Sequence, residues 1–174
     1  MKRGMNITIR GETGSDRETI GEVTKAAFDT LSISGHTEQF IILALREAKA
    51  LTVSLVAEVD GKIVGHIAIS PVAISDGSPG WYSLGPISVL PELQRRGIGK
   101  ALMQEGMSRL RSMGAGGCVL VGDPGYYERF GFRSFPDLSV EGVPPQNVLA
   151  LPFGETRAHD TVSFHEGFQA EKIR

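Results

Sequence analysis

Apolar and polar residues recur with two different periods along the chain, and together these periods predict a domain that mixes strands and helices. Alternation or a short apolar run predicts single strands at residues 6–10, 81–90, 117–122, 147–153 and 161–168, and two strands within residues 51–74. Apolar residues three or four positions apart predict helices within residues 14–28 and 37–48 and at about 96–113, and residues 123–132 fit a turn with a short helix.

Turn-forming residues indicate how these elements are connected. Asp60-Gly61 between two apolar runs is typical of a tight hairpin, so part of the sheet is expected to be antiparallel. Ser15 or Asp16 is expected to cap the first helix, and the glycines of "SMGAGG" to close the long one. Because this long helix forms a crossover, the strands before and after it are predicted to be parallel neighbours. The pattern therefore indicates an α/β domain with a mixed sheet.

Composition and charge narrow the classes of function. Of the 174 residues 41% are hydrophobic and 22% charged, and the net charge of -2 argues against a general binder of nucleic acid or anionic membranes. The longest apolar run, at residues 40–45, is too short to cross a bilayer, and no apolar stretch typical of a signal peptide follows the basic start. The lone Cys118 can form no internal disulfide, which fits a buried thiol and a cytoplasmic protein.

The stretch "VLPELQRRGIGKALMQEG", residues 89–106, places two glycines at the start of the long helix, where glycine weakens helical structure. The first turn of a helix presents unpaired N–H groups and a partial positive charge, and glycine leaves these amides open to a bulky anion. Arg95, Arg96 and Lys100 add positive charge around Gly97 and Gly99. The stretch therefore predicts a phosphate cradle.

Two common phosphate-binding motifs do not fit this stretch. A P-loop would need glycine in place of Gln94 and serine or threonine in place of Ala101. A dinucleotide fingerprint would need a third glycine in place of Leu102. Glycines that serve only tight packing of the helix against a strand remain the alternative interpretation.

Pro86 lies inside the strand that precedes the cradle. Proline cannot donate a ladder hydrogen bond, so in a central strand it implies a bulge or a broken ladder. Residues 87–89 and 118–121 are therefore expected to splay apart and to leave backbone groups free for an extended ligand. A slot for an amide-bearing arm beside a diphosphate site indicates coenzyme A.

With these features the chain resembles the GNAT superfamily of N-acetyltransferases. "PELQRRGIGKAL" is similar to its acetyl-CoA signature Q/R-x-x-G-x-G/A, and Gln94, Gly97 and Gly99 occupy the fixed positions. "VGDPGYYERFGF" resembles a later motif of the family, an aromatic-Tyr-Glu run that ends in Gly-Phe, and is most like the YhbS-like bacterial branch. The resemblance follows the element order over residues 6–153 and is sharpest at 84–102 and 122–132.

The resemblance implies a fold and a set of donor-binding residues. The fold is a mixed, mostly antiparallel central sheet flanked by helices, with a splayed parallel pair at the acetyl-CoA site. The backbone of Ile87, Ser88 and Val89 would pair with the pantetheine arm and the thioester carbonyl. The amides of the turn would bind the diphosphate; the turn comprises Gln94, Arg95, Arg96, Gly97, Ile98, Gly99 and Lys100. Acetyl-CoA is then the donor substrate, and no metal is needed.

Acetyl transfer to an amine requires a neutral amine, a site for the developing oxyanion and a proton for the leaving thiolate. Tyr127 matches the family tyrosine that protonates the thiolate, with aromatic packing as the alternative, whereas Tyr126 is expected to point elsewhere. Asp123 could orient the acceptor amine or serve only the turn. Glu58 and His66 on predicted strands could supply a base through water, although a strand histidine commonly has no such role.

Two functions remain open at this point. The favoured one is an N-acetyltransferase that transfers an acetyl group to a primary amine by direct attack in a ternary complex; the alternative is a non-catalytic module that binds or senses acyl-CoA. No His, Cys, Asp and Glu cluster has metal-ligand spacing. The acceptor, a small-molecule or peptide amine, is not identified, because residues 13–47 and the late strands carry no recognisable motif.

The expected organisation is one domain over residues 1–174. Its core covers about residues 6–153, and residues 154–174 form a C-terminal extension with a late strand. We expect a cytoplasmic monomer or homodimer without a nucleic-acid or membrane partner.

Overall fold

The computed structural model describes residues 5–31 and 34–170, and their strands form one eight-stranded sheet. The main path runs β1-β2-β3-β4-β5-β7, in which only the β4–β5 pair is parallel. Its strands are β1 (Ile7–Gly11), β2 (Val53–Val59), β3 (Lys62–Ile74), β4 (Trp81–Val89), β5 (Gly117–Val121) and β7 (Val148–Pro152). The mixed, mostly antiparallel sheet and the parallel β4–β5 neighbours confirm the sequence prediction.

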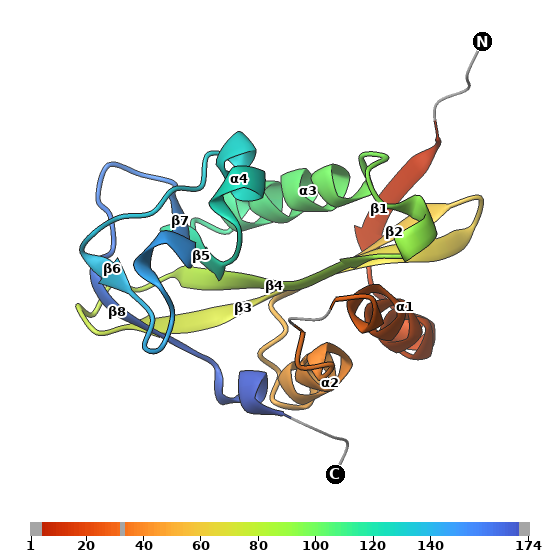
Figure 1. Ribbon diagram of the computed structural model, residues 1–174, viewed down its shortest axis with the longest axis horizontal. Helices are drawn as coiled ribbons and strands as arrows, with labels where there is room; N and C mark the ends of the chain where they lie inside the picture. Colours follow the sequence, from red (N-terminus) through yellow and green to blue (C-terminus); the bar gives the residue numbers. More distant parts are fainter. Residues whose placement is uncertain (1–4, 32–33, 171–174) are drawn as a thin grey trace.

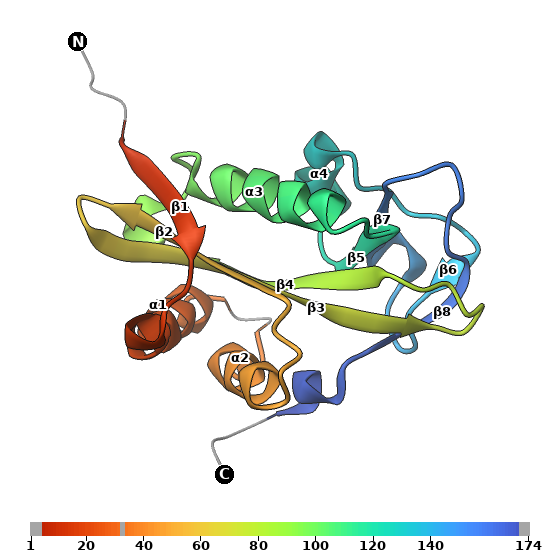
Figure 2. The ribbon, with the colours of Figure 1, turned by 180° about the vertical axis from the view of Figure 1, so that it is seen from behind.

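Helices cover both faces of this sheet. Figure 1 shows α1 (Arg17–Asp29) and α2 (Glu38–Glu47) on one face, with α3 (Ile98–Ser112) and the short α4 (Pro124–Tyr127) on the other. The same two layers are seen from behind in Figure 2. No helix within residues 5–31 and 34–170 is long and apolar enough to cross a membrane.

The alternation of the central strands explains why both faces are covered. Leu55 and Ile67 point to the α3 face and are buried with residues of that helix, including Leu102. Val56 and Ala68, each one position along, are buried on the opposite face with residues of α1 and α2. Both faces of β2 and β3 are therefore apolar, which is the reason for their nearly continuous hydrophobic runs.

Local turn chemistry behaves as predicted at the β2–β3 hairpin. Asp60 and Gly61 have φ values of 50° and 75°, and a positive φ at both central positions is what a tight hairpin turn of this kind requires. At the first helix, Asp16 is the N-cap residue, but its carboxylate binds Thr13 and Arg10 instead of the amides of α1. The prediction of Ser15 or Asp16 is thus met by Asp16, without a side-chain cap.

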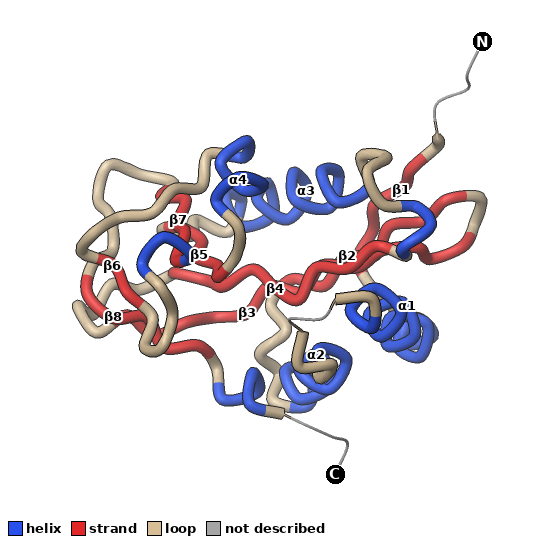
Figure 3. The backbone as a smooth tube through the Cα atoms, viewed as in Figure 1, coloured by secondary structure: helices blue, strands red, loops and turns tan. Residues whose placement is uncertain are grey.

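The late part of the chain extends the sheet at one end. β8 (Asp160–Phe164) pairs antiparallel with the far end of β3 and parallel with the two-residue β6 (Leu138–Ser139). Figure 3 shows β6 and β8 at the end of the sheet opposite to β1. A 3-10 turn at Glu166–Gln169 then places Phe168 against Ile41 and Leu45 of α2. The predicted late strand is confirmed, and residues 171–174 of the expected extension lie outside the described residues.

Candidate active site

The β4–β5 pair opens partway along its length. Ladder pairing joins residues Trp81, Tyr82 and Ser83 of β4 to Gly117, Cys118 and Val119 of β5 and then stops. Beyond this point β4 pairs only with β3, whereas Leu120 and Val121 of β5 pair only with β7. The predicted splay is therefore present, but it begins later on β5 than expected, because Cys118 and Val119 still pair with β4. Among the described residues it leaves one backbone edge of residues 84–89 without a strand partner.

A bulge in β4 marks the place where the pair separates. Ile69 pairs with Leu84 and Ile67 with Ile87, so Gly85 and Pro86 together lie opposite the single residue Ala68. Proline has no N–H to donate to a ladder, so this position suits a bulge. The strand then continues through Ser88 and Val89 to the turn before α3.

The turn after β4 exposes the N-terminus of α3. Gln94 donates a hydrogen bond from Nε2 to the carbonyl of Val89 at 3.1 Å, which ties the turn back to the strand. α3 begins at Ile98, two residues later than the sequence suggested, because Gly97 is its N-cap and has a φ of 88°. No side chain caps the helix and no acidic residue lies in its first turn. The first amides of α3 are therefore available to an anion.

The two glycines of the turn suit their positions for different reasons. Gly97 has open space around its missing Cβ, and its left-handed backbone conformation is what favours glycine. Gly99 is helical, but a Cβ there would lie 3.1 Å from the hydroxyl oxygen of Tyr126. The side chain of Ile98 between them is buried in the core and anchors the start of the helix.

The exposed side chains around this N-terminus are basic. Arg95, Arg96 and Lys100 are all exposed, and no ion pair of theirs with a carboxylate occurs among the residues that the structure describes. Arg95 also adopts a φ of 64°, which turns the chain toward Gly97. The geometry thus combines free helix amides with three unneutralised cations, an arrangement suited to a diphosphate.

The second predicted motif forms α4 and the 3-10 turn after it, Glu128–Phe130. Asp123 is the N-cap, and its carboxylate accepts a hydrogen bond of 2.9 Å from the amide of Gly125. Asn147, which the sequence analysis did not single out, donates from Nδ2 to the carbonyl of Gly122 at 3.0 Å. These two contacts hold the short turn that carries both tyrosines.

Tyr127 lies half-buried beside the end of β5. A Cβ at Gly122 would come within 2.6 Å of its ring, and the ring of Phe132 contacts it edge-on at 6.2 Å between centroids. Burial, with a smaller contribution from Tyr126, raises the pKa of Tyr127 to about 12. The phenol is therefore protonated at neutral pH and can act as a proton donor.

Tyr126 points toward the start of α3. Its hydroxyl lies over Gly99 at the start of α3, and its ring meets that of Tyr127 edge-on at 4.9 Å between centroids. The guanidinium of Arg129 stacks on the same ring at 4.9 Å. Tyr126 therefore connects α4 to the cradle, a long-range contact for which the local sequence gives no signal.

The side chains of Glu58 and His66 interact with residues of β1 and β2. Glu58, near the end of β2, forms an ion pair with Arg10 of β1, and β3 separates its strand from β4. His66 on β3 lies opposite Ser88 of β4, but its side chain is completely buried. Within the described part of the chain, neither side chain forms a hydrogen bond or an ion pair with Tyr127.

A chain of hydrogen bonds accounts for His66. Arg46 donates two hydrogen bonds of 3.0 Å to the carboxylate of Glu12, and the Ser54 hydroxyl also donates to it. Ser54 Oγ can then only accept from His66 Nε2, which lies 2.7 Å away. Burial lowers the pKa of His66 to about 4, so the ring is neutral with its proton on Nε2.

Within the described residues, no group of three or more His, Cys, Asp or Glu side chains could hold a metal ion. Cys118 is fully buried on β5, and burial raises the pKa of its thiol far above the usual range. The groups at the opening are thus backbone amides, basic side chains and two phenols, which suit anion binding and proton donation.

Comparisons with known proteins agree on one family. The family model described as the acetyltransferase (GNAT) family matches residues 21–132. The uncharacterized N-acetyltransferase YhbS of Escherichia coli K12 is 32% identical over 128 residues, which are 73% of this chain and 74% of that protein. A second E. coli protein, the uncharacterized N-acetyltransferase YjhQ, is 34% identical over 75% of this chain and 70% of its own.

Solved structures give the same result. A GNAT family acetyltransferase from Brucella melitensis in complex with acetyl-CoA is 46% identical, with a TM-score of 0.84 over 94% of this chain and 99% of that one. YhbS from E. coli in complex with CoA is 26% identical, with a TM-score of 0.87 over 99% of this chain and 97% of that one.

Proposed function

The chain belongs to the GNAT acetyltransferase family, and from this premise we propose that it transfers the acetyl group of acetyl-CoA directly to a primary amine in a ternary complex. The observation that carries the proposal is the opening of β4 from β5 immediately beside the uncapped N-terminus of α3. The complexes of the Brucella and E. coli relatives with acetyl-CoA and CoA support the choice of donor.

The donor binds through backbone groups in this proposal. The amides of residues 96–100 hold the diphosphate, with Arg95, Arg96 and Lys100 as neighbouring cations and Gln94 holding the turn. The pantetheine amides pair with the free edge of β4 at Ile87, Ser88 and Val89, where β5 no longer pairs. A strand N–H in this segment also stabilises the oxyanion, an effect typically worth about 3–4 kcal/mol.

Tyr127 supplies the proton that the leaving thiolate takes up. The amine nitrogen forms a bond to the carbonyl carbon, the carbon–sulfur bond breaks, and the thiolate takes the phenolic proton; the proton lost by the amine passes to solvent and restores the phenol. A phenol whose pKa is raised to about 12 stays protonated until the thiolate forms.

The acceptor must reach the thioester as a neutral amine. A lysine-like amine is neutral about 0.04% of the time at pH 7, a handicap of roughly 4–5 kcal/mol. Because Glu58 is paired with Arg10 and His66 is buried, the proposal assigns this deprotonation to neither residue. Asp123, exposed at the start of α4, is the one acidic candidate of the sequence analysis that lies beside Tyr127.

The proposal is tested by calorimetry with acetyl-CoA, followed by CoA release across a panel of polyamines, amino acids, aminoglycosides and peptide N-termini. Saturable binding with amine-dependent CoA release is the expected result. Binding without turnover on any amine would favour the alternative, a non-catalytic acyl-CoA sensor. No binding of acetyl-CoA would overturn both.

A further inference from the structure

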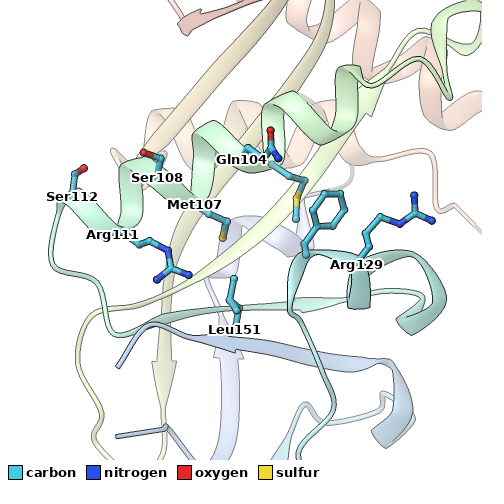
Figure 4. Close-up of a pocket in the computed structure, with 9 residues that line it drawn as sticks. Gln104, Met107, Ser108, Arg111, Ser112, Arg129 and Leu151 are labelled. Atoms are coloured by element: carbon cyan, nitrogen blue, oxygen red, sulfur yellow. The ribbon is translucent and has the colours of Figure 1, made fainter. Parts of the chain in front are cut away.

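The two faces of the sheet enclose different kinds of group. On the face that α3 covers, a pocket with a volume of ≈ 600 Å³ is lined by residues that include Met107, Arg111 and Leu151, as Figure 4 shows. On the opposite face, beneath α1 and α2, the strands β3 and β4 bury four polar side chains, those of His66, Ser70, Ser83 and Ser88. These groups are removed from water, so each needs a hydrogen-bond partner within the molecule.

One nitrogen of the His66 ring lacks such a partner. Nδ1 is the only buried side-chain nitrogen or oxygen within residues 5–31 and 34–170 that forms no hydrogen bond. Its neighbour Nε2 carries the ring proton, because the hydroxyl of Ser54 donates to Glu12 and can only accept from the ring. Nδ1 therefore presents a buried lone pair, and native proteins rarely leave an acceptor in this state. A further donor is expected at this position.

Ser88 lies directly opposite His66 and is buried beside it. The amide of Leu90 donates to the carbonyl of Val64 at 2.9 Å, so the pair two positions along is also of the hydrogen-bonded kind. Opposite side chains leave the same face of the sheet with Cβ atoms roughly 4.5–5.5 Å apart. The hydroxyl of Ser88 is thus the polar group next to the ring, although no direct hydrogen bond joins it to Nδ1.

The hydroxyl protons around Ser88 are already committed. Thr24 of α1 donates to the carbonyl of Ile20 at 2.7 Å. Its oxygen lies 3.5 Å from Ser88 Oγ and, with its own proton given away, can only accept from Ser88. No other group in the described part of the chain donates to Ser88 Oγ. Ser88 Oγ and His66 Nδ1 are therefore two neighbouring acceptors with no donor between them.

We propose that one internal water molecule lies between His66 and Ser88 and donates one hydrogen bond to Nδ1 and the other to Ser88 Oγ. Water is a small neutral group with two donors, and it commonly bridges buried polar groups that are too far apart for direct contact. Ser88 and Ala68, the next residue on this face of β3, are both small and leave space beside the ring. Glu12 is already paired with Arg46, so no free negative charge favours a cation over water.

The water joins two chains of hydrogen bonds into one network. One chain runs from His66 through Ser54 to the carboxylate of Glu12. The other runs from Ser88 to Thr24 of α1. Every donor in both chains points away from the water, so its two protons complete them without the reversal of any hydroxyl. The network connects the segment after β1 with β2, β3, β4 and α1, and it does not depend on the proposed function.

The first experiment is a high-resolution crystal structure of the wild type, grown without ammonium salts. One water should lie at a hydrogen-bond distance, about 2.7–3.2 Å, from both Nδ1 of His66 and Oγ of Ser88. Ser88→Val removes the acceptor and fills its space, so it should lack this water. The matched control is Ser83→Val, which changes a buried serine whose hydroxyl contacts Ser70 at 3.2 Å, and it should keep the water. An empty site in the wild type, or a direct bond from Ser88 to Nδ1, would overturn the inference.

The second experiment works in solution and needs no crystal. Oxygen-17 relaxation counts long-lived internal waters, and Ser88→Val should contain one fewer than the wild type and Ser83→Val. Nitrogen-15 spectra of the histidine-labelled wild type should show the proton on Nε2 of His66 and a hydrogen bond accepted by Nδ1. These spectra decide the question even where Ser88→Val does not fold. A proton on Nδ1, or an Nδ1 that accepts no hydrogen bond, would contradict the proposed water.

Discussion

Tyr127 contributes a single hydroxyl group to the proposed reaction, and its surroundings keep that group protonated. Burial raises its pKa to about 12, so no loss of activity from its ionisation is expected below about pH 11. Its ring also packs against Gly122 and Phe132, so a change at this position must keep the ring. Phenylalanine removes the hydroxyl and preserves the packing.

Tyr127→Phe should therefore lower kcat by about 10²- to 10⁴-fold, the usual contribution of a general acid, without changing the affinity for CoA. The loss should shrink with thioesters whose thiol is more acidic, because such leaving groups need less protonation. Single-turnover rates and calorimetry measure the two effects. A Phe variant with the wild-type rate, under conditions where chemistry is limiting, would reduce Tyr127 to a packing residue.

Gly99 and Tyr126 should behave as a coupled pair. In the wild type a Cβ at Gly99 meets the Tyr126 hydroxyl at 3.1 Å, so Gly99→Ala gains little of the stability that alanine usually brings to a helix. In a Tyr126→Phe background the hydroxyl is absent, and Gly99→Ala should raise the free energy of unfolding by up to about 1 kcal/mol. Denaturant unfolding of the four proteins in the cycle measures this coupling. Identical effects in both backgrounds would rule out the contact.

At the scale of elements, two short segments hold the site open. The bulge at Gly85 and Pro86 lies where β4 separates from β5, and the short helix α4, capped by Asp123, presents both tyrosines. Each segment is fixed by local chemistry: a proline without an N–H in the first, and an aspartate that accepts from Gly125 in the second.

Substitutions of Asp123 separate its two possible roles. Asp123→Asn keeps an N-cap acceptor. Asp123→Ala removes it and should lower the free energy of unfolding by about 1 kcal/mol. If Asp123 serves only the turn, the Asn variant should keep the wild-type kcat and the Ala variant should lose both stability and activity. If its charge assists the acceptor, the Asn variant should be stable but slow. Thermal unfolding and steady-state rates on one acceptor distinguish the two cases.

At the scale of the whole molecule, a chain of polar side chains, half-buried except for the fully buried His66, joins the segment after β1 to α2, β2 and β3. It consists of Glu12, Arg46, Ser54 and His66. Burial raises the pKa of Glu12, but the hydrogen bonds from Arg46 and Ser54 outweigh it and leave that pKa below its usual value. Burial lowers the pKa of His66 to about 4. The fold therefore contains a histidine that is neutral when folded and becomes protonated near pH 6.5 when unfolded.

Between pH 6.5 and 4 the unfolded chain binds a proton at this histidine that the folded chain does not, so stability falls as the pH falls through this window. Across this window the free energy of unfolding should fall by roughly 3 kcal/mol, since one pKa unit corresponds to about 1.4 kcal/mol. Denaturant unfolding at pH 7, 5.5 and 4.5 should show this decline in the wild type and in His36→Gln, an exposed control. His66→Gln should flatten it. An equally steep decline in His66→Gln would assign the effect to other groups.

Much of the fold, and the geometry at the start of α3, could be predicted from the sequence because their causes are local. The Asp60-Gly61 turn, the apolar runs of β2 and β3, and the crossover between β4 and β5 depend on residues close together in the chain. The free helix N-terminus also depends on a local signal, glycine at positions 97 and 99. The sequence could therefore locate the opening and its cradle.

Only the tertiary structure decided which side chains meet across the chain. It turned Tyr126 onto Gly99, buried His66 against Ser54, paired Glu58 with Arg10, and brought β8 to the end of β3. None of these contacts has a periodic or turn signal, because each joins residues far apart in sequence whose approach depends on the packing of whole elements. Local patterns thus predicted the opening between β4 and β5 and the uncapped start of α3, and packing determined which side chains surround them.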